Sequence, residues 1–310
     1  MENGSQKINE IIEFLSGYLH GKERALRLAL IAFFSKGHLL VEDLPGLGKT
    51  TLAIAVAKAL DLGFGRIQCT SDLLPTDITG LSIYNKNTGE FEFRSGPVFN
   101  NIVLVDEINR ATPKTQSAFI ECMGEKQTTI ERQTYMLPRP FFVIATQNPV
   151  EQFGTFPLPE SQLDRFMMKI SIGYPSRDAE KEILRGGSKR GELYTMKPMM
   201  NKEDVLAVSE DIRKRVYVSD KILDYLLAIV EATRSNKYLM AGISTRGALA
   251  IHHTARTNAY FKGRDFVIPE DITELAEYLM PHRIIFREEF EQLERKEIVQ
   301  SLLDQIPAPV

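Results

Sequence analysis

The segment GHLLVEDLPGLGKTTLA, residues 37–53, joins a short apolar run to a glycine-containing loop and then to a sequence that strongly favours a helix. A buried strand, a loop and a helix in this order form the context in which a loop binds phosphate. The first backbone N–H groups of a helix lack partners within the helix, so they attract an anion. The segment therefore predicts an α/β protein with a phosphate site at the start of the helix.

The loop supplies the groups that such a site needs. Gly46 and Gly48 let the backbone curl closely around the anion. Lys49 neutralises phosphate charge, and the Thr50 hydroxyl can bind Mg²⁺. We expect ATP or ADP to bind here with Mg²⁺. The predicted nucleotide-binding residues of the loop are Pro45, Gly46, Leu47, Gly48, Lys49, Thr50 and Thr51.

The loop departs from the usual pattern at its first position, where Asp43 stands in place of glycine. Glycine is useful there because it tolerates unusual φ angles, and Asp is among the few other residues that enter such conformations. An Asp43 side chain that pointed inward would repel phosphate, whereas one that pointed away would not. The rest of the pattern is intact, so we predict that the loop still binds ATP.

Two further apolar runs end in polar side chains. NIVLVDE ends in Asp106 and Glu107, and PFFVIATQN ends in Asn148. Three such runs predict an open α/β sheet with a ligand at the carboxyl ends of its strands. After a phosphate loop, Asp106 is the candidate Mg²⁺ ligand together with Thr50. Glu107 is the candidate general base that activates the attacking water.

The remaining pattern divides the chain into two parts. Residues 84–96 and 125–137 alternate as β-hairpins do. Strand signals stop near Tyr174, and Pro175 would break a strand. We therefore predict an α/β ATPase domain over residues 1–174 and an all-helical domain over residues 175–310. The predicted helices are 7–18, 22–35, 178–190, 202–213, 219–236, 244–262, 269–280 and 287–304.

Composition narrows the class of protein. The 310 residues are long enough for two cores, and the net charge of -3 gives no overall basic field for nucleic acid or anionic lipid. No stretch approaches the roughly 18 apolar residues that span a bilayer. The two cysteines and the spacing of the five histidines fit neither a disulfide framework nor a zinc site. We expect a soluble, cytoplasmic protein.

Three blocks carry a resemblance to a known family. GHLLVEDLPGLGKTTLA, IVLVDEINRATPKTQSAFIECM and IATQNPVEQFGTFPLPESQLDRF together closely resemble the MoxR family of AAA+ ATPases, over essentially the whole chain. The third block is the most specific of them. The resemblance implies an AAA+ P-loop NTPase of the helix-2-insert clade, with a parallel-sheet core of the ASCE type and a C-terminal all-helical lid domain.

The resemblance also implies roles for three further residues. Asn148 is the polar sensor between the carboxylates and the γ-phosphate, and Arg165 is a finger that reaches the neighbouring subunit's site. Arg246, in STRGAL, is a second sensor that touches phosphate from the lid, either in its own subunit or in a neighbour. Position alone leaves both arginines open as surface ion-pair residues. The nucleotide is then expected between the two domains and against the next subunit. The two hairpins are expected to face a central pore or a partner, with capping of the core as the alternative.

The implied function is Mg²⁺-dependent ATP hydrolysis by a ring, most simply a hexamer, that remodels or matures protein complexes as a chaperone does. Its implied partners are von Willebrand factor A domain proteins or other protein clients. A nucleic-acid motor, the ATPase subunit of a metal chelatase and a non-hydrolysing nucleotide-gated scaffold stay open. Net charge disfavours the motor, the third block favours MoxR over a chelatase, and the presence of Glu107 and Arg165 argues against the scaffold.

Overall fold

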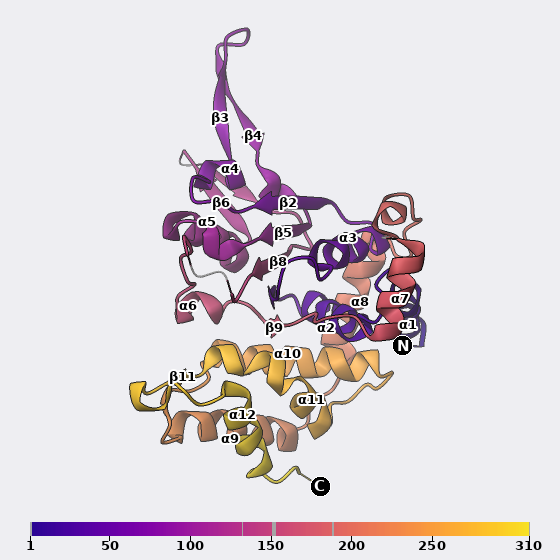
Figure 1. Cartoon of the computed structure of the whole chain (residues 1–310), viewed down its shortest axis with the longest axis vertical. Coiled ribbons are helices and arrows are strands. Elements are labelled where there is room, and N and C mark those ends of the chain that lie inside the picture. The colour runs from indigo at the N-terminus through magenta and orange to yellow at the C-terminus, as the bar shows by residue number, and fades with distance from the viewer. Residues whose placement is uncertain (1, 132, 151–152, 188, 310) are drawn as a thin grey trace.

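The computed structural model describes residues 2–131, 133–150, 153–187 and 189–309, and it has an α/β part and a helical part (Figure 1). The α/β part holds a five-stranded parallel sheet in the order β2-β5-β8-β1-β9. Its strands are β1 (Leu39–Glu42), β2 (Phe64–Gln68), β5 (Ile102–Asp106), β8 (Phe142–Gln147) and β9 (Met168–Ile170). The three apolar runs singled out in the sequence are thus the adjacent strands β5, β8 and β1, which confirms the predicted α/β sheet.

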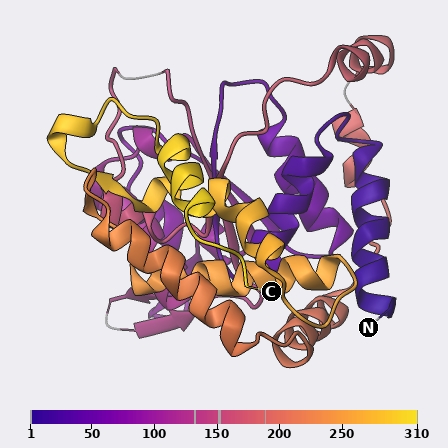
Figure 2. The same ribbon diagram turned by 90° about the horizontal axis from the view of Figure 1, so that it is seen from below.

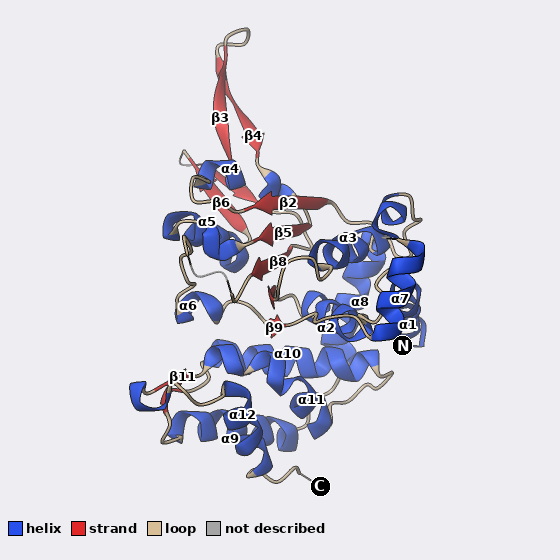
Figure 3. Cartoon of the chain, in the orientation of Figure 1, coloured by secondary structure: helices blue, strands red, loops and turns tan. Residues whose placement is uncertain are grey.

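Helices cover both faces of this sheet (Figure 3). Successive side chains of a strand point to opposite faces, and Leu39 and Val41 join one buried cluster while Leu40 joins the other. The first cluster includes α1 (Glu2–Ser16), α2 (Glu23–Phe34) and α3 (Lys49–Ala59), and the second includes α5 (Pro113–Glu125). Burial on both faces explains why the central strands are continuous apolar runs.

Two antiparallel hairpins extend from the α/β part, and the first projects furthest (Figure 1). It consists of β3 (Gly80–Asn85) and β4 (Glu90–Ser95), so it begins four residues before the predicted range of 84–96. The second consists of β6 (Gln127–Ile130) and β7 (Gln133–Met136), within the predicted range of 125–137. Phe93 of the first stacks on Tyr135 of the second with ring centroids 4.1 Å apart. The hairpins therefore support each other at their bases.

The C-terminal part is mainly helical, with differences from the prediction. The helix predicted over 287–304 begins only at Arg295, because a short 3₁₀ turn at Glu288–Phe290 precedes it. Strands β10 (Leu239–Ala241) and β11 (Ile285–Phe286) form a small antiparallel sheet. Strands this short do not show a recognisable alternation of apolar and polar residues in the sequence. The prediction of no strands after residue 174 was therefore wrong. The helices are α7 (Arg177–Gly186), α8 (Lys202–Arg215), α9 (Asp220–Ser235), α10 (Thr245–Phe261), α11 (Pro269–Leu279) and α12 (Arg295–Asp304).

The segment after α7 returns to the α/β part before the chain enters the later helices. Gly187, at φ +70°, ends α7 earlier than the predicted residue 190. The backbone N–H groups of Met199 and Met200 donate to the Ala59 carbonyl at the end of α3, at 2.9 and 3.0 Å, and Leu193 is fully buried. The domain boundary at residue 174 stays a prediction, and this segment beyond it lies against α3.

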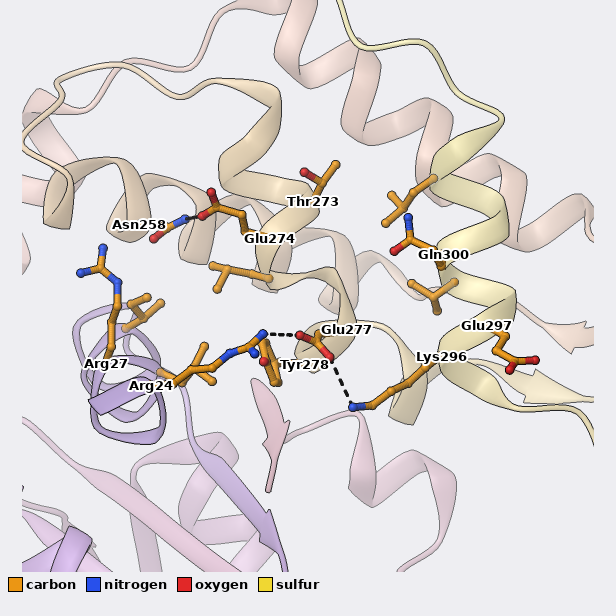
Figure 4. A pocket seen from close by; sticks show the side chains of 15 residues that line it. Arg24, Arg27, Asn258, Thr273, Glu274, Glu277, Tyr278, Lys296, Glu297 and Gln300 are labelled. Atoms are coloured by element: carbon orange, nitrogen blue, oxygen red, sulfur yellow. Dashed lines mark hydrogen bonds and ion pairs between the residues drawn. The ribbon is translucent and has the colours of Figure 1, made fainter. Parts of the chain in front are cut away.

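Helices α9 to α12 lie below the β9 edge of the sheet in the view of Figure 1 and so stand in front of the sheet in the view from below (Figure 2). Helix α10 contacts both α1 and α2. Glu277 of α11 joins the two parts through its ion pair to Arg24 of α2, and within the helical part it pairs with Lys296 of α12 at 3.4 Å (Figure 4). These residues line a cavity of about 680 Å³ that includes none of the predicted site residues. Within the described ranges, no helix is both long and apolar enough to cross a membrane.

Candidate nucleotide-binding site

A cavity of about 310 Å³ lies beside the N-terminus of α3 and the carboxyl ends of β5 and β8. It brings together the predicted loop residues, except Leu47, with the predicted carboxylates and Asn148. Two predicted residues, Arg165 and Arg246, do not line it. The lining residues are Pro45, Gly46, Gly48, Lys49, Thr50, Thr51, Arg66, Gln68, Asp106, Glu107, Thr146, Asn148 and Arg190.

The backbone of the loop is shaped for an anion. Gly46 and Gly48 have φ angles of +84° and +95°, in the left-handed region that side chains disfavour. Helix α3 begins directly afterwards at Lys49, and its N-cap residue, Gly48, has no side chain that could cap it. The first N–H groups of α3 are therefore free to donate to phosphate oxygens, and the helix dipole favours negative charge at the same point.

The side chain of Lys49 is close enough to Asp43, Asp106 and Glu107 for their charges to act on it. Its ammonium donates to the backbone carbonyl of Asp43 at 2.6 Å. Burial lowers the pKa of Lys49, and the charges of Asp43, Asp106 and Glu107 oppose that shift. A phosphate bound here would likewise favour the charged ammonium, so Lys49 is suited to neutralise the terminal phosphates of a nucleotide.

Asp43 is turned away from the phosphate cavity. Its carboxylate accepts hydrogen bonds from Ser171 Oγ at 3.1 Å, from Gly173 N at 3.0 Å and from the backbone N–H of Ile172, just after β9. The Lys22 ammonium, which donates to the Gly173 carbonyl, lies close enough for its charge and that of Asp43 to interact. Asp43 thus fixes the start of the loop to the end of β9, and its carboxylate already has hydrogen-bond donors there.

We therefore predict that Asp43→Gly, which restores the usual loop pattern, destabilises the protein. Losing a buried, hydrogen-bonded carboxylate is expected to cost about 1–3 kcal/mol, which lowers the melting temperature by several degrees. Nucleotide affinity should change by less than about threefold, because the side chain does not face the phosphates. Thermal unfolding and calorimetric titration with ADP measure the two effects. Ser171→Ala, which removes one of the three donors, is the matched control, and tenfold tighter ADP binding by Asp43→Gly would contradict the assignment.

Asp106 offers an oxygen ligand for a cation at the end of β5. It is 7% exposed, its Oδ1 accepts from Thr146 Oγ1 at 3.3 Å, and its Oδ2 accepts from Arg66 Nε at 2.8 Å. The Thr50 hydroxyl lines the same cavity. Carboxylate and hydroxyl oxygens fit Mg²⁺, which takes few protein ligands and completes its shell with phosphates and water. The described residues hold no cluster of three or more His, Cys, Asp or Glu side chains suited to a metal.

Glu107 is held at the rim of the same cavity in an unusual backbone conformation. Its φ of 57° and ψ of 52° lie in the left-handed region, and its N–H donates to Thr146 Oγ1 at 3.0 Å. Gln68 Nε2 donates to its Oε2 at 3.0 Å, and Arg110 Nε lies 3.1 Å from the same oxygen. Backbone strain that the surroundings maintain in this way is common at functional sites.

The sequence interpretation missed four residues of this cavity. Arg66 and Gln68 alternate along β2, a strand with too little apolar character to be predicted. Thr146 precedes Asn148 by two residues, so strand periodicity could have placed both on one face. Arg190 was interpreted as a helix end, whereas it lies in the 3₁₀ segment Lys189–Tyr194, near α3.

Arg165 and Arg246 line a separate hollow of about 360 Å³. Arg246 Nη1 lies 3.4 Å from Asp164 Oδ2, and the buried Arg283 places Nε 3.0 Å from Asp164 Oδ1. Among the residues that the structure describes, none lines both this hollow and the phosphate cavity. Arg190, from the predicted helical domain, lines the phosphate cavity, whereas Arg246 does not. That the nucleotide lies between the two domains and against the next subunit, and that Arg246 touches phosphate, stay predictions. Residues of α8 to α12 do not line the phosphate cavity.

Comparison with known proteins matches both parts of the chain. Residues 38–168 match the ATPase family associated with various cellular activities (AAA), and residues 231–302 match the AAA lid domain. The uncharacterized protein YeaC of Bacillus subtilis is 44% identical, over 98% of this chain and 95% of that protein. Chaperone MoxR1 of Mycobacterium tuberculosis is 40% identical, over 86% of this chain and 72% of that protein.

A solved structure agrees over nearly the whole length. The crystal structure of a candidate ATPase from Cytophaga hutchinsonii is 41% identical and superposes with a TM-score of 0.92, covering 99% of this chain and 96% of that one. The fold is therefore that of an α/β AAA+ protein with a helical lid. Together with the similarity to MoxR1 and the phosphate loop opposite two carboxylates, this shows that the chain belongs to the MoxR family of AAA+ ATPases.

Proposed function

We propose that this protein is a Mg²⁺-dependent ATPase whose subunits act in a ring and remodel protein complexes. The observation that carries the proposal is the uncapped N-terminus of α3, which shares one cavity with Lys49, Asp106 and Glu107. Phosphoryl transfer needs phosphate binding, charge neutralisation and an oriented water, and these groups supply all three.

The predicted site residues of the cavity have definable tasks in hydrolysis. The N–H groups of the loop and Lys49 bind the phosphates of ATP or ADP, and Thr50 and Asp106 hold Mg²⁺, which neutralises developing charge. Glu107 accepts a proton from the attacking water as that water bonds to the γ-phosphorus and the bond to the β–γ bridging oxygen breaks. Asn148, which lines the cavity beside both carboxylates, orients the water or the γ-phosphate.

The separate position of Arg165 and Arg246 supports action between subunits. Both arginines line a hollow that shares no described residue with the phosphate cavity of the same chain. A cation delivered by a neighbouring subunit stabilises the transition state only when subunits assemble. We therefore propose that both arginines act in trans in a closed ring, a hexamer by family likeness.

The two hairpins offer a surface for a protein client. Tyr84, Phe91 and Met136 are more than half exposed on them, and aromatic side chains are typical of protein interfaces. The first hairpin mixes Glu90 and Glu92 with its basic residues, so it lacks the basic stripe of a nucleic-acid motor. Together with the similarity to a relative named chaperone MoxR1, this surface favours remodelling of protein complexes. By the family resemblance, von Willebrand factor A domain proteins are candidate partners.

The first experiment measures ADP binding by calorimetry and phosphate release from ATP over a wide range of protein concentration. Lys49→Ala is expected to weaken nucleotide binding at least about 100-fold, because a charged hydrogen bond to phosphate is lost in a partly buried site. Lys58→Ala, on the same helix but outside the cavity, is the matched control. Hydrolysis per subunit should rise with concentration as rings assemble.

The same measurements separate the alternatives. Nucleotide binding without phosphate release at any concentration would favour a non-hydrolysing scaffold. Phosphate release that single-stranded or double-stranded DNA stimulates would favour a motor. If Lys49→Ala bound ADP as tightly as the Lys58→Ala control, the loop would not be the nucleotide-binding site, and the proposal would be overturned.

A further inference from the structure

We propose that Arg66 is a positioning residue that holds Asp106 when no metal is bound and releases it to Mg²⁺. Arg66 thereby sets how strongly nucleotide binding depends on Mg²⁺. This inference rests on the proposed function of the same cavity. It assigns a role to a strand residue whose ion pair occupies an oxygen of the candidate metal ligand.

Strand pairing places Arg66 next to Asp106. Strand β2 lies parallel to β5, with Gln68 opposite Asp106 and Arg66 two residues earlier on β2. Arg66 Nε lies 2.8 Å from Asp106 Oδ2, and Arg66 Nη2 donates to Gln68 Oε1 at 3.4 Å. The Asp106 side chain is 10% exposed and that of Arg66 is 47% exposed. The carboxylate is therefore fixed, while the guanidinium has room to move.

A metal and this guanidinium compete for the same carboxylate. The other oxygen of Asp106 already accepts a hydrogen bond from Thr146 Oγ1. A divalent cation near Asp106 would also repel the positive charge of Arg66 at short range. Charge repulsion between Mg²⁺ bound beside Thr50 and Asp106 and the Arg66 guanidinium therefore favours withdrawal of the Arg66 side chain, and its half-exposed position allows that movement.

The competition gives Arg66 opposite effects in the two metal states. Without Mg²⁺, Arg66 neutralises Asp106 and so weakens the repulsion between that carboxylate and a nucleotide's phosphates. With Mg²⁺, breaking the ion pair costs part of the metal's binding free energy. Removing Arg66 should therefore weaken metal-free binding, and leave binding with Mg²⁺ unchanged or tighter. A general structural defect would instead weaken both.

The test compares ADP dissociation constants in excess EDTA and in excess Mg²⁺, measured by calorimetry on the full chain. ADP is used so that hydrolysis does not interfere. For a half-exposed ion pair, Arg66→Ala is expected to raise the ratio of the metal-free to the Mg²⁺ constant about threefold to tenfold over wild type. Arg66→Lys, which keeps the charge but not the fork of donors, should give an intermediate ratio. Arg94→Ala, on β4 outside the cavity, is the matched control.

The outcomes separate this inference from the function on which it rests. An Arg66→Ala ratio equal to that of wild type, or a decrease of both affinities by one factor, overturns the role of Arg66 and leaves the ATPase proposal standing. A wild-type protein that binds no ADP in either condition overturns the proposed function, and this inference with it. A raised ratio of the metal-free to the Mg²⁺ dissociation constant in Arg66→Ala, with thermal unfolding by circular dichroism like that of wild type, supports the proposal that Asp106 passes from Arg66 to Mg²⁺.

Discussion

Replacing Glu107 with Gln is expected to lower the rate of ATP hydrolysis at saturating ATP by at least about 100-fold, the usual contribution of a positioned general base. The amide has nearly the same shape as the carboxylate but cannot accept the proton of the attacking water. Its oxygen can still accept the hydrogen bond that Gln68 donates to Glu107, so the rim of the cavity should keep its geometry. Nucleotide affinity should therefore change by less than about threefold.

Phosphate release at saturating ATP and calorimetric titration with ADP measure the two quantities for Glu107→Gln. Glu121→Gln, an exposed glutamate on α5, is the matched control and should match wild type in both. A Glu107→Gln variant that retains more than a tenth of the wild-type rate would show that another group activates the water. Loss of nucleotide binding in the variant would instead assign Glu107 to binding rather than to chemistry.

The parts of the fold that local sequence determines were predictable. Strands β1, β5 and β8 are buried on both faces, so each appears as a continuous apolar run, and the loop before α3 needs left-handed backbone at Gly46 and Gly48. The polar residues at the ends of these strands meet in one cavity because the strands are parallel and adjacent. The parallel pairing of adjacent strands therefore brings three segments that are separate in the sequence together in one site.

The parts that depend on distant contacts were not predictable from one sequence. Asp43 finds its donors after β9, about 130 residues later, and nothing near Asp43 in the sequence signals that contact. Arg66 lies on an edge strand with a mixed pattern, so neither the strand nor its ion pair with Asp106 could be inferred. The separation of Arg246 from the phosphate cavity depends on how the lid packs, which is a property of the whole fold.

Arg165→Ala is expected to lower hydrolysis about 1,000-fold at every protein concentration, the usual effect of removing an arginine finger, while ADP binding persists. Its sharpest consequence appears when this variant is mixed with Glu107→Gln. If Arg165 acts in trans, a site with an intact Glu107 regains activity when its neighbour supplies an intact Arg165. In a random equal mixture, about one interface in four pairs the two correctly, so the mixture should recover about a quarter of the wild-type rate.

Action in cis predicts a different result, because each variant chain then carries one defect in its own site and mixing repairs neither. The subunits are diluted below the concentration at which activity rises and are then concentrated together, so that rings form from both variants. Arg177→Ala, an exposed arginine of α7, replaces Arg165→Ala in the control mixture. The same experiment with Arg246→Ala decides whether the second arginine of the hollow also serves the neighbouring site. Recovery with both arginine variants would mean that the hollow around Asp164 is one half of a nucleotide site that assembly completes.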